Sequence, residues 1–122
     1  MRVAAAPLKA WHVVVGFAWG VRAVRTARSQ LRRGGLSVSL PHPPAISVTG
    51  IRGVRLAARI LRATCLERSL VLQRWHLAHG REVAVVIGVA NEHDTTIAHA
   101  WLEGEERTEE WPYVELTRVP PR

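Results

Sequence analysis

The hydrophobic pattern changes its period at Gly80, and this change constrains the fold more than any other feature of the chain. Before Gly80 the apolar residues recur at helical spacing, and after it they gather in runs of strand length. The chain has 122 residues, the size of one domain with a modest core. We therefore expect an α+β protein in which helices pack on a small antiparallel sheet.

Two of the predicted helices lie in the first half of the chain. The first covers residues 1–33, carries arginines in its last turns and stops at Gly34-Gly35. A proline-rich connector follows over 36–49, and its first residues, 36–40, alternate as a short edge strand would. The second helix covers residues 50–63, with arginines on its solvent side.

The third predicted helix, residues 65–79, is apolar around most of its circumference. Thr64 is suited to cap its N-terminus and Gly80 to end it. A helix of this kind belongs in the middle of a fold. We therefore divide the chain into a basic helix with its connector, 1–49, and a core, 50–122, within one compact domain.

Three strands are predicted after Gly80, and short turns join them. Their ranges are 83–89, 96–102 and 111–116. Consecutive strands with short connections usually pair in sequence order, so we predict an antiparallel meander.

The charge is distributed unevenly along the chain. The net charge is +7, nearly every cation is arginine, and no Asp or Glu precedes Glu67. Such a surface could bind nucleic acid, a membrane surface or an acidic partner. No nucleic-acid-binding motif is present, and we favour solvated arginine faces, with an acidic partner for the N-terminal half left open.

A targeting or membrane role for the N-terminus is weaker. The uncharged run from Trp11 to Val21 is too short for the roughly 20 residues that span a bilayer. A signal peptide is disfavoured because the arginine pattern continues past the run, and peripheral membrane contact stays open. The single cysteine cannot form an internal disulfide, which indicates either a reducing compartment or a thiol kept for its chemistry, and we expect a cytoplasmic location.

Cys65 is the first candidate for chemistry. It stands at the predicted N-terminus of a helix, where free N–H groups and the helix dipole stabilise a thiolate. The alternative is a small buried hydrophobic residue, which is the common role of a lone cysteine. A nucleophilic thiol also needs a base within hydrogen-bonding distance.

His99 is the best of the six histidines for that base. It sits inside a predicted strand between two alanines, where a rigid element can hold the ring. His76 shares a helix with Cys65 but lies about 16 Å along it. The alternative for His99 is a structural strand histidine.

A third group should orient the imidazole, and the hairpin after His99 supplies the candidates. Glu103 is about 13 Å along the same strand, which is too far. The predicted hairpin places Glu110 opposite His99, with Glu109 second, unless both are solvated turn charges. A metal site from His93, Asp94 and His99 is disfavoured because no metal-binding spacing supports it, and no cofactor is predicted.

Three blocks of sequence then resemble a known family. Residues 65–70 (CLERSL), 86–89 (VIGV) and 98–103 (AHAWLE) resemble the transglutaminase-like cysteine peptidases of lasso peptide biosynthesis, the leader peptidases called B proteins. The resemblance covers about residues 60–110. It implies a papain/transglutaminase-like fold and a Cys-His-acid triad.

The residue roles follow from that resemblance. Cys65 and His99 match the family's nucleophile and base. The family's acid is usually an aspartate a little further past the histidine, where this chain has Glu109 and Glu110. The resemblance thus implies a cysteine endopeptidase that removes the leader from a ribosomally made precursor peptide.

The resemblance also implies partners. The chain looks like the stand-alone peptidase, which acts with a separate leader-recognition protein, a precursor peptide and an asparagine-synthetase-like cyclase. Two other functions remain open. One is a transglutaminase-like acyltransferase with the same triad, and the other is a non-enzymatic basic adaptor for peptide or nucleic acid in which Cys65 is buried and inert.

Overall fold

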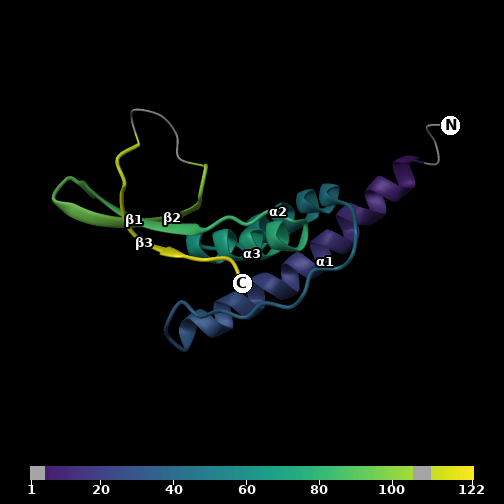
Figure 1. Ribbon diagram of the computed structural model, residues 1–122, viewed down its shortest axis with the longest axis horizontal. Coiled ribbons are helices and arrows are strands. Elements are labelled where there is room, and N and C mark those ends of the chain that lie inside the picture. Colours follow the sequence, from purple (N-terminus) through teal and green to yellow (C-terminus); the bar gives the residue numbers. More distant parts are fainter. Residues whose placement is uncertain (1–4, 106–110) are drawn as a thin grey trace.

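The computed structural model describes residues 5–105 and 111–122, with side chains from residue 10, and it is an α+β protein, as predicted (Figure 1). The helices are α1 (Ala5–Arg32), the short 3₁₀ helix η1 (Val48–Gly50), α2 (Ile51–Ile60) and α3 (Cys65–Ala78). The strands are β1 (Val85–Glu92), β2 (Thr95–Leu102) and β3 (Val114–Val119). Helices α1 and α2 pack together, and among the described helices only α3 contacts the sheet.

The helices lie close to their predicted bounds. The α1 helix ends at the two glycines, Gly34 and Gly35, whose positive φ angles favour glycine. The second helix begins as a 3₁₀ turn before α2. Gly53 lets α1 and α2 approach closely, because a Cβ there would lie 1.9 Å from the Val13 carbonyl oxygen.

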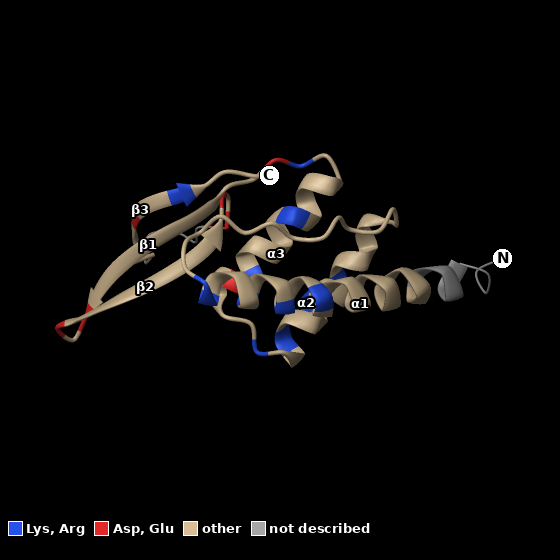
Figure 2. Cartoon of the chain, turned by 90° about the horizontal axis from the view of Figure 1, so that it is seen from below, with Lys and Arg blue, Asp and Glu red and all other residues tan. Residues whose placement is uncertain are grey.

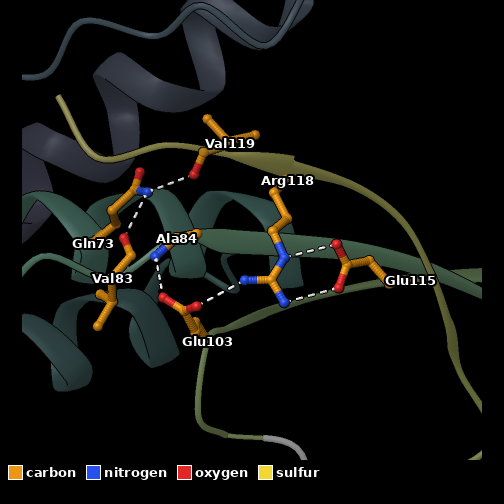
Figure 3. A network of polar contacts seen from close by, with 7 residues as sticks. All are labelled: Gln73, Val83, Ala84, Glu103, Glu115, Arg118 and Val119. Carbon is orange, nitrogen blue, oxygen red and sulfur yellow. Dashed lines mark hydrogen bonds and ion pairs between the residues drawn. The ribbon is translucent and has the colours of Figure 1, made fainter.

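Helix α3 is central, as its apolar circumference predicted. Leu70, Val71, Leu72 and Trp75 are all buried on it. Its amide side chain at Gln73 donates to two backbone oxygens of the sheet layer, those of Val83 at 3.0 Å and Val119 at 2.9 Å (Figure 3). One helical side chain thus fixes both the entry to β1 and the end of β3.

The sheet is antiparallel but is not the predicted meander. Its order is β2-β1-β3, so β3 pairs with β1 and not with β2. His99 accordingly pairs with Gly88 of β1, and not with residues 110–112. The β1–β2 hairpin turns on His93 and Asp94, both at positive φ, the geometry of a two-residue hairpin turn.

An ion-pair network joins β3 to the end of β2. The Arg118 guanidinium binds the Glu115 carboxylate at 2.7 Å and the Glu103 carboxylate at 2.7 Å (Figure 3). The other oxygen of Glu103 accepts from the Ala84 N–H at 3.3 Å. The two strands that do not pair with each other are therefore connected across β1 by side chains.

The connector forms no strand at residues 36–40. The Gln30 side chain accepts from the Ser39 N–H at 2.7 Å and donates to the Ser39 carbonyl at 2.8 Å, so a glutamine amide occupies the place of a strand partner. Trp19 donates from its indole to the Pro41 carbonyl at 3.2 Å. Both contacts hold the connector along α1.

The predicted apolar face of α1 is only partly buried. Trp19 and Val24 belong to the core, whereas Trp11 and Val14 are 61% and 56% exposed. The longest helix therefore carries an exposed apolar patch near its start. Within the described part of the chain, no helix combines the length and the apolarity needed to span a bilayer.

Candidate functional site

Cys65 is the first residue of α3, and local sequence fixes it there. The Thr64 side chain caps the helix by accepting from the Glu67 N–H at 3.1 Å, and the Glu67 carboxylate accepts from the Thr64 N–H at 3.0 Å. This reciprocal pair is a capping box, and it confirms Thr64 as the predicted N-cap. The half-buried thiol is therefore held at a well-defined helix start.

The thiol faces the free edge of the sheet. The Ala100 N–H of β2 points to the Cys65 sulfur, with 3.4 Å between nitrogen and sulfur. Because β2 is an edge strand, this N–H has no neighbouring strand to bind, and the sulfur takes that place. The thiol is therefore tied to the edge strand by a backbone hydrogen bond.

Further donors lie at the helix start. The N–H groups of Cys65 and Leu66 have no hydrogen-bond partner among the described residues, as expected in the first turn of a helix. The N–H of Glu67 is already used by the cap. Two backbone donors next to the sulfur are thus available to a negatively charged oxygen.

His99 lies on β2, one residue before Ala100, and projects from the opposite face of the strand. Ring contacts hold its imidazole. The ring centroids of Tyr113, Trp111 and Trp101 lie 5.0, 5.8 and 6.0 Å from it. No described side chain hydrogen-bonds to the imidazole, so stacking fixes its position within the described part of the chain.

Gly88 makes room for this arrangement. A Cβ at Gly88 would lie 2.6 Å from the Trp101 ring, so the indole lies directly over the glycine backbone. Trp101 and Trp111 then meet edge to face at 5.2 Å. We call the four rings of His99, Trp101, Trp111 and Tyr113 the aromatic cluster.

Cys65 and His99 line one cavity of about 390 Å³ between α3 and the edge of β2. Its walls come from both layers: Cys65, Arg68, His99, Ala100, Trp101, Glu105 and Trp111. The structure thus brings together the two residues that the sequence analysis paired from positions 34 residues apart. A cavity with a thiol, an imidazole and free N–H donors suits attack on a carbonyl group.

The two acids predicted to orient His99, Glu109 and Glu110, fall outside the described residues. They were predicted from a pairing of β2 with β3, which the sheet order contradicts. Glu103, which the sequence analysis rejected, is bound to Arg118 and Ala84.

Two charged residues of the cavity were not predicted as site residues. Glu105 lines the cavity, and its carboxylate accepts from the Leu102 N–H at 2.9 Å. Arg68 lines it from α3, one turn beyond Cys65. The three-residue spacing between Cys65 and Arg68 was a usable signal, whereas Glu105 had been assigned only to a turn.

A buried ion pair supports the helix that carries Cys65. The Arg28 guanidinium of α1 binds the Glu67 carboxylate at 3.0 Å, and Glu67 is 6% exposed. Burial alone would raise the pKa of Glu67, but the hydrogen bonds from Arg28 and from the Thr64 backbone, with the charge of Arg28, outweigh burial and lower it. Glu67 therefore stays ionised and holds α1 against the start of α3.

The other histidines lie apart from the cavity, and the disfavoured metal site has no support from geometry. His93 and Asp94 form the distal hairpin turn. Among the described residues, no three His, Cys, Asp or Glu side chains gather closely enough to hold a metal ion. His76 lies in a neighbouring pocket with Arg55 and Arg81, and burial followed by these two charges lowers its pKa.

Comparison with known proteins adds one finding. A family model described as the transglutaminase-like superfamily matches residues 11–116, which include most of α1, all of α2 and α3, and the strands β1 and β2. No curated protein and no solved structure matches the chain. A cysteine at the start of a helix packed on a three-stranded antiparallel sheet is consistent with a transglutaminase-like fold.

Proposed function

This chain belongs to the transglutaminase-like superfamily, and from that membership we propose that it is a cysteine peptidase that removes the leader from a lasso peptide precursor. Membership implies hydrolase or transferase chemistry that depends on a cysteine and a histidine. The observation that carries the proposal is the cavity shared by Cys65 and His99. The three sequence blocks that resemble the lasso leader peptidases support the choice of substrate.

The proposed reaction begins at the Cys65 thiol. His99 takes the thiol proton, and the sulfur attacks the carbonyl carbon that joins leader to core. The tetrahedral intermediate carries a negative charge on oxygen, to which the N–H groups of Cys65 and Leu66 donate hydrogen bonds. His99 then returns the proton to the departing amine, and a thioester to the leader remains.

Water completes the cycle. His99 removes a proton from water as the oxygen attacks the thioester carbonyl, and the sulfur leaves. The leader departs with a new carboxylate, and the core has already left with a new amine. The Ala100 N–H stabilises the sulfur as a leaving group and as a nucleophile alike.

An acid should hold the imidazole in its reactive orientation. We propose Glu110 for this role, with Glu109 second, because the related peptidases carry their acid a little past the histidine. Glu105 competes with both because it lines the cavity. Replacing each of the three by Gln and comparing kcat separates them, and we expect the largest fall for Glu110→Gln.

Two partners complete the proposal. We infer that the peptidase acts with a separate leader-recognition protein, which delivers the precursor, and with an asparagine-synthetase-like cyclase, which uses the released core. The resemblance to the lasso leader peptidases supports both partners. The need for the recognition protein is tested by mixing the purified chain with the precursor, with and without that protein. We expect cleavage only when the chain and the recognition protein are both present.

The central test is cleavage of the precursor, followed by mass spectrometry. We expect Cys65→Ala to abolish cleavage and His99→Ala to reduce it by about 10³-fold or more. Thermal unfolding of Cys65→Ala provides the control, because it shows whether the variant is folded under the assay conditions. Cleavage by a folded Cys65→Ala protein would refute the proposal.

The same assay separates hydrolysis from acyl transfer, the second chemistry of the superfamily. With a primary amine such as methylamine present, a peptidase releases a leader with a free carboxylate. A transferase releases the amide. The two products differ in mass, and we expect the acid.

A further inference from the structure

A second concave surface adjoins the Cys65 cavity. It is a groove of about 350 Å³ along α2 and the turn before α3, lined by Arg55, Ala58, Arg59, Arg62, Ala63 and Arg68. We call it the arginine groove. Four of its six lining residues are arginines and none is acidic.

The four guanidinium groups have no partner within the described part of the chain. The ion pairs found there involve only Arg28 and Arg118. No side-chain hydrogen bond forms at Arg55, Arg59, Arg62 or Arg68 either. Four adjacent cations that form no ion pair among the described residues make a binding surface for anions.

The groove leads into the cavity that holds the thiol. Arg68 lines both, and it lies one helical turn beyond Cys65. Figure 2 shows that the basic residues lie mainly on the helices and the acidic residues mainly around the sheet, although β3 also carries a basic residue and α3 an acidic one. A peptide whose carbonyl reaches Cys65 therefore meets the arginine groove on its helical side.

Arg62 adds an independent observation. Its φ angle is 52°, a left-handed conformation that favours glycine at the end of a helix. Glycine would adopt this backbone conformation with less strain than arginine does. The strain is consistent with a use for the guanidinium outside the fold.

We propose that the arginine groove binds an acidic stretch of the substrate peptide next to the scissile bond. This inference rests on the proposed peptidase function and names a property of its substrate. Carboxylates fit because guanidinium groups bind them through paired hydrogen bonds. A nucleic acid fits less well, because the groove floor is Ala58 and Ala63 and offers no aromatic ring for stacking bases.

The first test measures binding, so it does not depend on catalysis. The probe is a fluorescent peptide of alternating Glu and Gly, and its control is the Gln-Gly peptide of equal length. We expect the Cys65→Ala protein to bind the Glu peptide at low salt, with the Gln peptide at least about tenfold weaker. Equal binding of both peptides overturns the proposal.

Variants then locate the binding. Arg59→Gln/Arg62→Gly removes two charges from the groove, and glycine at position 62 relieves the backbone strain. We expect about tenfold weaker binding with unchanged or higher thermal stability. The matched control, Arg22→Gln/Arg25→Gln, removes two charges from a separate surface, which lies on α1. An equal loss in the control would show that net charge alone attracts the peptide and would overturn the proposal.

The last arm links the groove to the thiol. We expect the Glu peptide to slow iodoacetamide alkylation of Cys65 in the native protein, but not in Arg59→Gln/Arg62→Gly. Binding without protection would show that the groove does not serve the Cys65 cavity. Tighter binding of an oligothymidylate of equal charge, with the same arginine dependence, would favour nucleic acid and overturn the peptide assignment. If binding and protection hold but precursor cleavage fails, the proposed function falls while the groove assignment stands.

Discussion

The two walls of the Cys65–His99 cavity are held by different kinds of contact. On the helical wall, a capping box and a buried ion pair fix Cys65 within the main core. On the sheet wall, ring contacts fix His99 on the face away from the helices. Different parts of the fold therefore support the stability of the protein and the position of the imidazole. Changes in the helical wall should mainly cost stability, and changes in the aromatic cluster should mainly cost activity.

The largest effect is expected where α1 meets α2. Gly53→Ala places a methyl group against the Val13 carbonyl and 2.5 Å from the Phe17 nitrogen, so the two helix backbones must separate. We expect the free energy of unfolding to fall by about 3 kcal/mol or more. Urea denaturation measures it. Arg52→Ala on the exposed side of α2 is the control, and a Gly53→Ala protein as stable as this control would show that the helical wall is not tightly packed.

The next effect concerns the buried ion pair. Glu67→Ala leaves Arg28 without its partner and removes half of the capping box, so we expect a loss of about 2 kcal/mol, discounted because Arg28 is partly exposed. Glu67→Gln keeps an N3 side chain able to cap and isolates the charge. A double-mutant cycle with Arg28→Met gives the coupling energy. A coupling energy near zero would show that the ion pair between Arg28 and Glu67 does not stabilise the helical wall.

The helical wall was predictable because its signals are local. Thr64, Cys65 and Glu67 lie within four positions, and a capping box with an apolar run marks a helix start wherever it occurs. The partner of Glu67 was not predictable, since Arg28 lies 39 residues earlier. Glu67 is buried, which is uncommon for a glutamate and is explained by this long-range partner.

The sheet wall was predictable only in part. Alternating apolar runs indicated three strands, and the small neighbours of His99 marked it as a candidate. The predicted strand order was wrong because β3 begins only at Val114, well after β2 ends at Leu102, and sequence spacing alone does not choose between the two edges of β1. Gly88 carried a signal in retrospect, since a glycine inside a strand often marks the close approach of another group.

The aromatic cluster provides the converse prediction. Trp111→Leu removes the ring that contacts both His99 and Trp101, while Trp111 itself is only half-buried. We expect a loss of about 1 kcal/mol in stability and a fall of about tenfold in kcat. Denaturation and precursor cleavage measure the two effects on one preparation. A variant that loses stability but keeps full activity would break the division between the two walls.

The smallest effect is expected in the pH dependence of stability. His76 of α3 has a pKa below its ordinary value of 6.5, because of burial first and then the charges of Arg81 and Arg55. Below about pH 6.5 the unfolded chain binds a proton at this histidine that the folded chain resists. The contribution of His76 to stability is therefore full above that pH and is lost as pH falls toward the lower folded value. Between pH 7.5 and 5, the melting temperature of His76→Gln should fall less steeply than that of the unchanged protein.

The same histidine reports on the charge of the arginine groove, because Arg55 lines the groove and also faces His76. Arg55→Gln removes one of the charges that oppose protonation, so the pKa of His76 should rise toward its ordinary value in an NMR titration. Arg25→Gln, on a different surface of α1, should leave it unchanged. A rise of equal size in both variants would mean that total charge sets the potential at His76. A rise in the pKa of His76 that occurs only in Arg55→Gln would show that the arginine groove creates a local positive potential on the helical wall. Arg68 belongs to the same groove and also lines the Cys65 cavity, so this potential would lie beside the cavity.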